Sequence, residues 1–192
     1  MNRFPASSVL LLALLAWSGC SRTTSQDSAT NRVLQGDQVR LLVPTLSKFA
    51  AVDDLRDFTL RVRPDHRARY HRSYFSLEAP RGCVNAEVMI AADWLGDDAV
   101  NPAWGFDFGP VGQEFLIPLH LTFEFDHHDL EGLDPALLTL LLDLENGSYE
   151  VIPSTVEEFL DLDEVVLEAD VEHFSRYLIG VGPPPDDNGG GH

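Results

Sequence analysis

The sequence predicts an all-β protein built as an antiparallel β-sandwich, and three features lead to this class. Apolar side chains occupy alternate positions in residues 114–125, EFLIPLHLTFEF, and the positions between them include His120, Thr122 and Glu124. A period of two is that of a strand with one buried and one solvated face. Short β-type runs recur at intervals of about ten residues, separated by turn residues, as in sandwiches. An Asn-Gly pair at 146–147 predicts a type I′ hairpin.

The expected strands follow one another along the chain as residues 38–43, 57–64, 73–80, 85–92, 114–125, 137–144, 148–153 and 165–180. Pro118 has no amide proton to donate, so it predicts an edge position or a bulge. The leucines of 137–144 would also suit a helix, but the Asn-Gly turn favours a strand, which follows a short turn at Asp134 and Pro135. Residues 154–164 are expected to include one helical turn.

The N-terminus predicts export. An apolar run from Val9 to Trp17 follows a single basic residue, Arg3, and is too short to cross a bilayer, so residues 1–19 are interpreted as a signal peptide. The sequence Ser18-Gly19-Cys20 resembles a bacterial lipoprotein box. This resemblance implies that Cys20 is diacylated and becomes the new N-terminus. A plain secretory signal is the alternative.

Flexible segments are predicted at both ends of the exported chain. Residues 20–36 are interpreted as a lipidated polar tether, and residues 182–192, rich in Pro, Gly and Asp, as a disordered tail. If Cys20 carries lipid, the other cysteine, Cys83, is expected to be a buried, inert thiol. If Cys20 is not lipidated, a Cys20–Cys83 disulfide is possible in an oxidising compartment.

Charge is distributed unevenly along the chain. The net charge is −18, yet residues 20–82 hold 11 basic and 7 acidic residues, whereas residues 83–192 hold 24 acidic residues and one basic residue, Arg176. An acidic surface repels nucleic acid and anionic lipid headgroups, so neither is an expected partner. The acids would attract a divalent cation or a basic partner, or form a solvated face. The four arginines of residues 63–72 are expected to pair with the acidic half, or else with a phosphate-bearing envelope polymer.

Three pieces of the sequence occur in a characteristic order. They are APRGCVNAEVMI (79–90), FGPVGQEFLIPLHLTFEF (108–125), and LTLLLDLENGSYEVIP (138–153) followed by VEHFSRYLIG (171–180). Together they resemble the ZU-five domain, the β-sandwich module of ankyrins, netrin receptors and many bacterial surface proteins. The resemblance covers residues 72–181, with Cys83-Val84 where the family usually has Ala-Leu. It implies an interaction or scaffold module without catalytic activity. Residues 37–71 have no counterpart and are expected to form an extra β segment.

The triplet His173-Phe174-Ser175 carries an alternative function. Some proteins that resemble this domain cleave themselves between the Phe and Ser of such a triplet. Ser175 Oγ would attack the Phe174 carbonyl, His173 would polarise the peptide or take the proton, and water would resolve the ester. This chemistry needs a strained peptide. Strand alternation places His173 and Ser175 inside and Phe174 outside, unless a bulge near His173 shifts the register. The triplet is therefore interpreted first as a signature of the fold.

Two acidic stretches contain residue types that bind metals. Asp126, His127, His128 and Asp129 could contact a metal, but neighbouring side chains of a strand point to opposite faces, so a solvated loop is favoured. Residues 161–164, DLDE, lack the glycine and the alternating ligands of a calcium loop. The sequence therefore predicts no metal-binding residues and no cofactor. Trp94 and Trp104 are expected to cover the core.

Together these features predict an exported, lipid-anchored protein of a bacterial cell envelope that acts as a non-catalytic interaction or structural module. Its expected partners are the membrane, through the lipid on Cys20, and a protein whose identity the sequence does not specify. The alternative is a self-processing domain cut between Phe174 and Ser175, which would leave an 18-residue fragment, residues 175–192.

Overall fold

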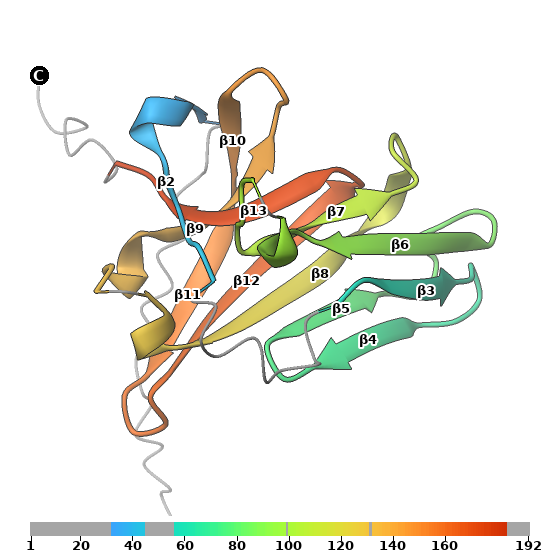
Figure 1. The fold of residues 1–192 in the computed structure, drawn as a ribbon. Coiled ribbons are helices and arrows are strands. Elements are labelled where there is room, and N and C mark those ends of the chain that lie inside the picture. Colours follow the sequence, from blue (N-terminus) through green and yellow to red (C-terminus); the bar gives the residue numbers. More distant parts are fainter. Residues whose placement is uncertain (1–31, 45–55, 99, 131, 184–192) are drawn as a thin grey trace, which may run out of the picture.

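In the computed structural model, which describes residues 32–44, 56–98, 100–130 and 132–183, 13 strands form two sheets. All strand pairs are antiparallel, and the sheets have eight and five strands (Figure 1). The predicted all-β class with two antiparallel sheets is confirmed. The predicted signal peptide, Cys20 and residues 184–192 lie outside the described residues. Within the described ranges, no helix is long and apolar enough to span a membrane.

The eight-stranded sheet has the order β1-β10-β9-β13-β7-β6-β3, with β2 also pairing with β13, and the five-stranded sheet has the order β11-β12-β8-β5-β4. The strands are β1 (Val33–Gln35), β2 (Arg40–Leu41), β3 (Phe58–Val62), β4 (Ala68–Arg72), β5 (Phe75–Ala79), β6 (Val88–Trp94), β7 (Gly105–Gly109), β8 (Glu114–Asp126), β9 (Leu138–Asp143), β10 (Ser148–Ile152), β11 (Ser154–Phe159), β12 (Glu164–His173) and β13 (Arg176–Val181). Short 3-10 turns are η1 (Gly36–Gln38), η2 (Leu95–Asp97), η3 (His127–Leu130) and η4 (Pro135–Leu137).

The long strand β8 follows the predicted alternation over its second half. Leu119, Leu121, Phe123 and Phe125 are buried, and the residues between them are only half-buried. The alternation fails earlier, because Ile117, expected inside, is 44% exposed. Glu114 of β8 lies opposite His173 of β12, and Leu119 lies opposite Val171, so β8 has extra residues in this interval. Pro118 lies in this irregular stretch, so the bulge that Pro118 predicted is found, and the pairing of β8 with β5 begins only at His120.

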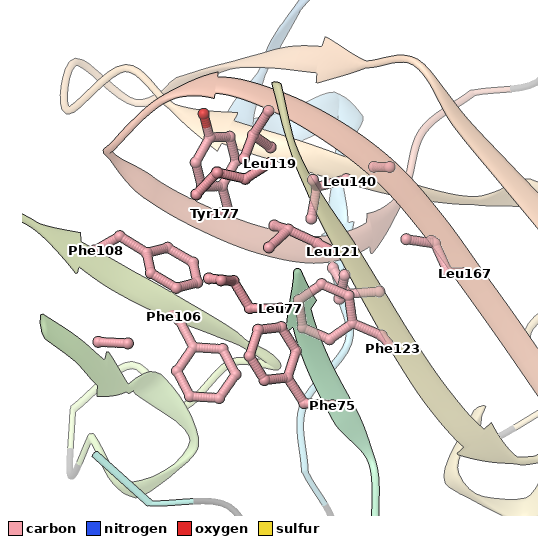
Figure 2. Packing of buried hydrophobic residues seen from close by; sticks show 14 of the residues in the cluster. Phe75, Leu77, Phe106, Phe108, Leu119, Leu121, Phe123, Leu140, Leu167 and Tyr177 are labelled. Atoms are coloured by element: carbon pink, nitrogen blue, oxygen red, sulfur yellow. The ribbon is translucent and has the colours of Figure 1, made fainter. Parts of the chain in front are cut away.

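Aromatic rings fill the space between the two sheets (Figure 2). The ring centroid of Phe75, on β5, lies 4.5 Å from that of Phe106 on β7 and 5.0 Å from that of Phe123 on β8. Trp94 and Trp104 are buried and meet edge to face at 5.3 Å, so their predicted place over the core is confirmed. Cys83 is a free, buried cysteine, and burial raises the pKa of its thiol.

Three local expectations are corrected by the structure. The tether was predicted to include residues 33–36, but Val33–Gln35 form β1, which pairs with β10 and buries Leu34, and Gly36 begins η1. The hairpin after β9 is not a two-residue type I′ turn, since the backbone amide of Leu144 donates to the carbonyl of Ser148 and the positive φ angles fall on Glu145 and Gly147. Residues 154–164 form β11 and a turn in place of the expected helical turn.

The described part of residues 37–71 completes both sheets. β3 pairs with β6 at the end of the eight-stranded sheet, and β4 pairs with β5 at the end of the five-stranded sheet. β2 pairs with Gly180 and Val181, whereas β7 pairs with residues 176–178 of the same strand. This segment therefore belongs to the same core as the rest of the chain.

The outer face of the five-stranded sheet carries paired charges around His120. Its Nδ1 atom lies 2.9 Å from Asp170 Oδ1, and its Nε2 atom lies 3.6 Å from Glu168 Oε1. On the other side, its register partner on β5 is Glu78, which pairs with Arg67. Burial by itself would lower the pKa of His120, but the hydrogen bond to Asp170 and the charges of Asp170 and Glu168 outweigh this and raise the pKa above its ordinary value of 6.5.

These contacts predict a pH-dependent contribution to stability. Because the folded chain holds the His120 proton more tightly, the contribution is fully present below the unfolded pKa of 6.5 and is lost as pH rises through the raised pKa. The destabilisation caused by His120→Gln should be about 0.5 kcal/mol larger at about pH 5.5 than at about pH 8.5, the scale of an exposed ion pair. Urea unfolding of the wild-type protein and His120→Gln at both pH values measures this difference. Titrating groups that the substitution does not affect contribute equally to both proteins. The same destabilisation at both pH values would contradict this prediction.

Candidate functional site

The His173-Phe174-Ser175 triplet marks the point where the chain passes from one sheet to the other. β12 of the five-stranded sheet ends at His173, and β13 of the eight-stranded sheet begins at Arg176. Phe174 is 2% exposed, with its ring centroid 4.6 Å from Phe115 and 5.9 Å from Phe108. The expectation that strand alternation leaves Phe174 outside is wrong. The register shift between Val171 and His173, which was the stated alternative, turns Phe174 inward.

The peptide groups of the triplet are tied to neighbouring segments on both sides. The backbone amide of Phe174 donates to the carbonyl of Gln113 at 3.0 Å, and the amide of Phe108 donates to the carbonyl of Ser175 at 3.1 Å. The Tyr177 hydroxyl donates to the carbonyl of His173 at 2.9 Å, and burial raises the pKa of this phenol. In the described chain, φ angles in the left-handed region occur outside glycine at Glu145 and Asp163, neither of which belongs to the triplet.

The next residue, Arg176, lies in a hollow on the outer face of the eight-stranded sheet. The hollow has a volume of about 300 Å³ and receives side chains from β2, the η2 loop, β9, β10 and β13. On β13, Tyr177 and Ile179 point into the main core, whereas Leu178 packs outward with Leu141 and Ala103 in a second, smaller apolar cluster. Arg176 shares the outward parity of Leu178. The lining residues are Leu41, Leu95, Asp98, Asn101, Ala103, Asp143, Tyr149, Arg176 and Leu178.

The electrostatics of this hollow are set by one guanidinium among carboxylates. Arg176 Nη2 lies 3.1 Å from Asp107 Oδ2, and Nη1 lies 3.9 Å from Asp143 Oδ2. Asp98 accepts hydrogen bonds from the backbone amides of Val100 at 2.8 Å and Asn101 at 3.1 Å, and these lower the pKa of its carboxyl group. Burial, together with the nearby Asp143 charge, raises the pKa of the Tyr149 phenol. The hollow thus combines a guanidinium already paired with Asp107, a neutral phenol and several apolar side chains, a combination suited to binding.

The sequence contained one signal for this site. Arg176 is the single basic residue after Arg81, so its charge stands alone in a strongly acidic stretch. The rest of the site could not be read from the sequence, because its lining comes from segments as distant as Leu41 and Leu178. Only sheet pairing brings these segments together.

The Asp-His-His-Asp stretch lies in a turn after the long strand, as predicted, but it is not wholly solvated, because Asp129 is buried. β8 ends at Asp126, and residues 127–130 form the turn η3, so the rule that neighbouring strand side chains diverge does not apply. One ligand atom from each of Asp126, His128 and Asp129 lies within 4.8 Å of the others. His127 is not part of this group, since its Nε2 lies 2.7 Å from Glu158 and its Nδ1 3.1 Å from Asp163.

Charged side chains of residues 161–164 and 63–72 pair with single neighbouring side chains. Asp163, from the DLDE sequence, meets His127, and no group of three metal-ligand atoms involving residues 161–164 forms among the described residues. Of the four arginines in residues 63–72, Arg63 lies 2.9 Å from Glu87 and Arg67 pairs with Glu78. Arg72 lies over the ring of Tyr70.

Comparison of the chain with protein-family models, with curated proteins and with solved structures found no match. Fold and site together define the chain as an all-β protein with two antiparallel, sandwich-like sheets and a hollow on the outer face of the larger sheet.

Proposed function

We propose that the chain is a lipid-anchored interaction module of a bacterial cell envelope, a ZU-five-like β-sandwich that binds a partner at the Arg176 hollow. The hollow is the observation that carries this proposal. Arginine and tyrosine are among the residue types that contribute most often to protein recognition, and here both line a hollow that also includes apolar side chains. A volume of about 300 Å³ suits an inserted side chain of a partner protein.

The anchor in this proposal is the lipid on Cys20. Its support is the short apolar run that ends in Ser18-Gly19-Cys20. The family assignment is supported by the places of the three motif pieces, which contain β9 and β10, nearly all of β8 and β13, and short parts of β6 and β7. The triplet contributes a buried phenylalanine at the crossover between the sheets.

The binding proposal is tested by site-specific photo-crosslinking in intact cells. A photoreactive residue is placed at Asn101, which is exposed and lines the hollow, or at the exposed Thr155 on the outer face of the other sheet as a matched control. We expect a discrete cross-linked protein from position 101 that is lost with Arg176→Gln. Cross-links from position 155 only, or cross-links from position 101 that Arg176→Gln leaves unchanged, would place recognition elsewhere.

Anchoring and self-processing are tested on the membrane-extracted protein. We expect one intact mass that begins at a diacylated Cys20 and includes residue 192, and we expect Cys20→Ser to release the protein from the membrane fraction. The hydrogen bonds on both sides of the Phe174–Ser175 peptide support an uncleaved chain. Two fragments under denaturing conditions that Ser175→Ala abolishes would favour the self-processing alternative.

A further inference from the structure

We propose that Asp126, His128 and Asp129 form a binding site for a divalent transition-metal ion, with zinc(II) as the ion that suits them best. The site lies where β8 leaves the five-stranded sheet and enters the turn η3 (Figure 1). Asp126 is the last residue of β8, and His128 and Asp129 lie in the turn that follows it. One ligand atom from each of these three residues lies within 4.8 Å of the others.

The distances fit a shared ion. His128 Nε2 lies 3.5 Å from Asp129 Oδ1 and 3.7 Å from Asp126 Oδ2. Metal–ligand bonds of about 2.1 Å at tetrahedral angles separate two ligand atoms by about 3.4 Å. The imidazole nitrogen is therefore within a few tenths of an ångström of the required separation from each carboxylate oxygen. The three ligand atoms, one from each residue, all lie within 4.8 Å of one another.

Burial makes this group different from an exposed acidic cluster. The Asp129 side chain is only 4% exposed, and its Oδ2 atom accepts a hydrogen bond from the backbone amide of Asp126 at 3.2 Å. That bond fixes the carboxylate so that Oδ1 faces His128. The side chains of His128 and Asp126 are 47% and 42% exposed, so an ion can reach the group and keep water as a further ligand.

The surroundings of Asp126 increase the negative potential. A hollow of about 120 Å³ next to it is lined by Glu124 and Glu164 as well as by Asp126 itself. Glu164 is the register partner of Asp126 across β12 and β8. Such a concentration of acids attracts divalent cations.

The ligand types select the class of ion. Calcium and magnesium prefer oxygen ligands alone, whereas an imidazole nitrogen with carboxylates suits zinc and related transition metals. His127, on the same turn, holds Glu158 and Asp163 of the β11–β12 hairpin. An ion on the neighbouring side chains would therefore stiffen the turn that joins β8 to this hairpin, which predicts a structural role and a higher melting temperature.

The test is calorimetric titration of the purified full-length protein, free of any affinity tag, with zinc chloride after removal of metal by a chelator. We expect saturable binding of one ion per chain and a higher melting temperature than in the chelator. His128→Ala should weaken binding by about 100-fold. The matched control is His71→Ala, which removes a histidine from β4 on the same sheet and should leave binding unchanged.

A spectroscopic measurement separates this site from unspecific binding by exposed acids. Cobalt(II) in place of zinc should give visible ligand-field absorption that is lost in His128→Ala and reduced in Asp129→Asn. Because Asp129 is buried, near-ultraviolet circular dichroism is used to check that the Asp129→Asn protein is folded. If that variant does not fold, the test relies on His128→Ala, which replaces an exposed side chain. The absence of saturable binding, or equal binding by the wild-type chain and His128→Ala, would overturn the proposal.

Discussion

Replacing Gly105 with alanine is expected to lower the free energy of unfolding by about 3 kcal/mol or more. A Cβ atom at this position would lie 2.1 Å from the carbonyl oxygen of Tyr177 and 2.9 Å from the Cα atom of Leu178. Both are backbone atoms of β13, which pairs with β7 at this point, so no side-chain rotation can relieve the clash. The φ angle of Gly105, +152°, is also one that other residues rarely adopt. Urea unfolding followed by circular dichroism measures the loss.

Gly112→Ala is the matched control for this prediction. Gly112 also has a positive φ angle, +79°, but no atom within 4 Å of an added Cβ. Its replacement should therefore cost only the backbone strain, about 1 kcal/mol. Similar losses in the two variants would show that the close approach of β7 to β13 is not what requires Gly105.

The second large effect is expected from Phe174→Ala, which should cost about 3–4 kcal/mol. The ring is buried between Phe108 of β7 and Phe115 of β8, so it contacts both sheets where the chain crosses between them. Its removal would leave a cavity whose walls belong to hydrogen-bonded strands of both sheets, and these cannot collapse around it without losing hydrogen bonds. Thermal and urea unfolding measure the change.

Ser175→Ala tests the same triplet without disturbing the packing. Since Ser175 is half-buried and its removal leaves no cavity, the free energy of unfolding should change by less than about 1 kcal/mol. A large loss for Phe174→Ala with a small loss for Ser175→Ala would identify the triplet as a packing feature. Similarly small losses of unfolding free energy in both variants would contradict the packing role proposed for Phe174.

Local patterns in the sequence were sufficient to predict the class of fold and much of the core. The alternation in β8 is visible in the sequence because side chains of a strand point alternately to its two faces, whatever the partner strands are. Pro118 correctly indicated a break in that strand, because a residue without an amide proton cannot complete the pairing of a central strand. The strand character of residues 138–143 was also predictable, although the detailed turn that follows was not.

The candidate sites depended on where strands end, and this was less predictable. A strand reaching past Asp126 would send His128 and Asp129 to opposite faces, whereas a strand ending there lets a turn gather them. The strand was expected to end at residue 125 and ends at Asp126, but the shape of the turn that gathers these side chains could not be predicted from the sequence. Phe174 shows the same sensitivity, because the register shift near His173 exchanges inner and outer faces.

By itself, the sequence determined the all-β class, the inner face of β8 and the isolated charge of Arg176, because each is a property of composition or of neighbours along the chain. Only the tertiary structure decided that Leu41, Asn101 and Tyr149 border the same hollow and that Phe174 lies inside. The physical reason is that pairing between strands distant in the sequence sets the register. The register then determines which side chains share a face.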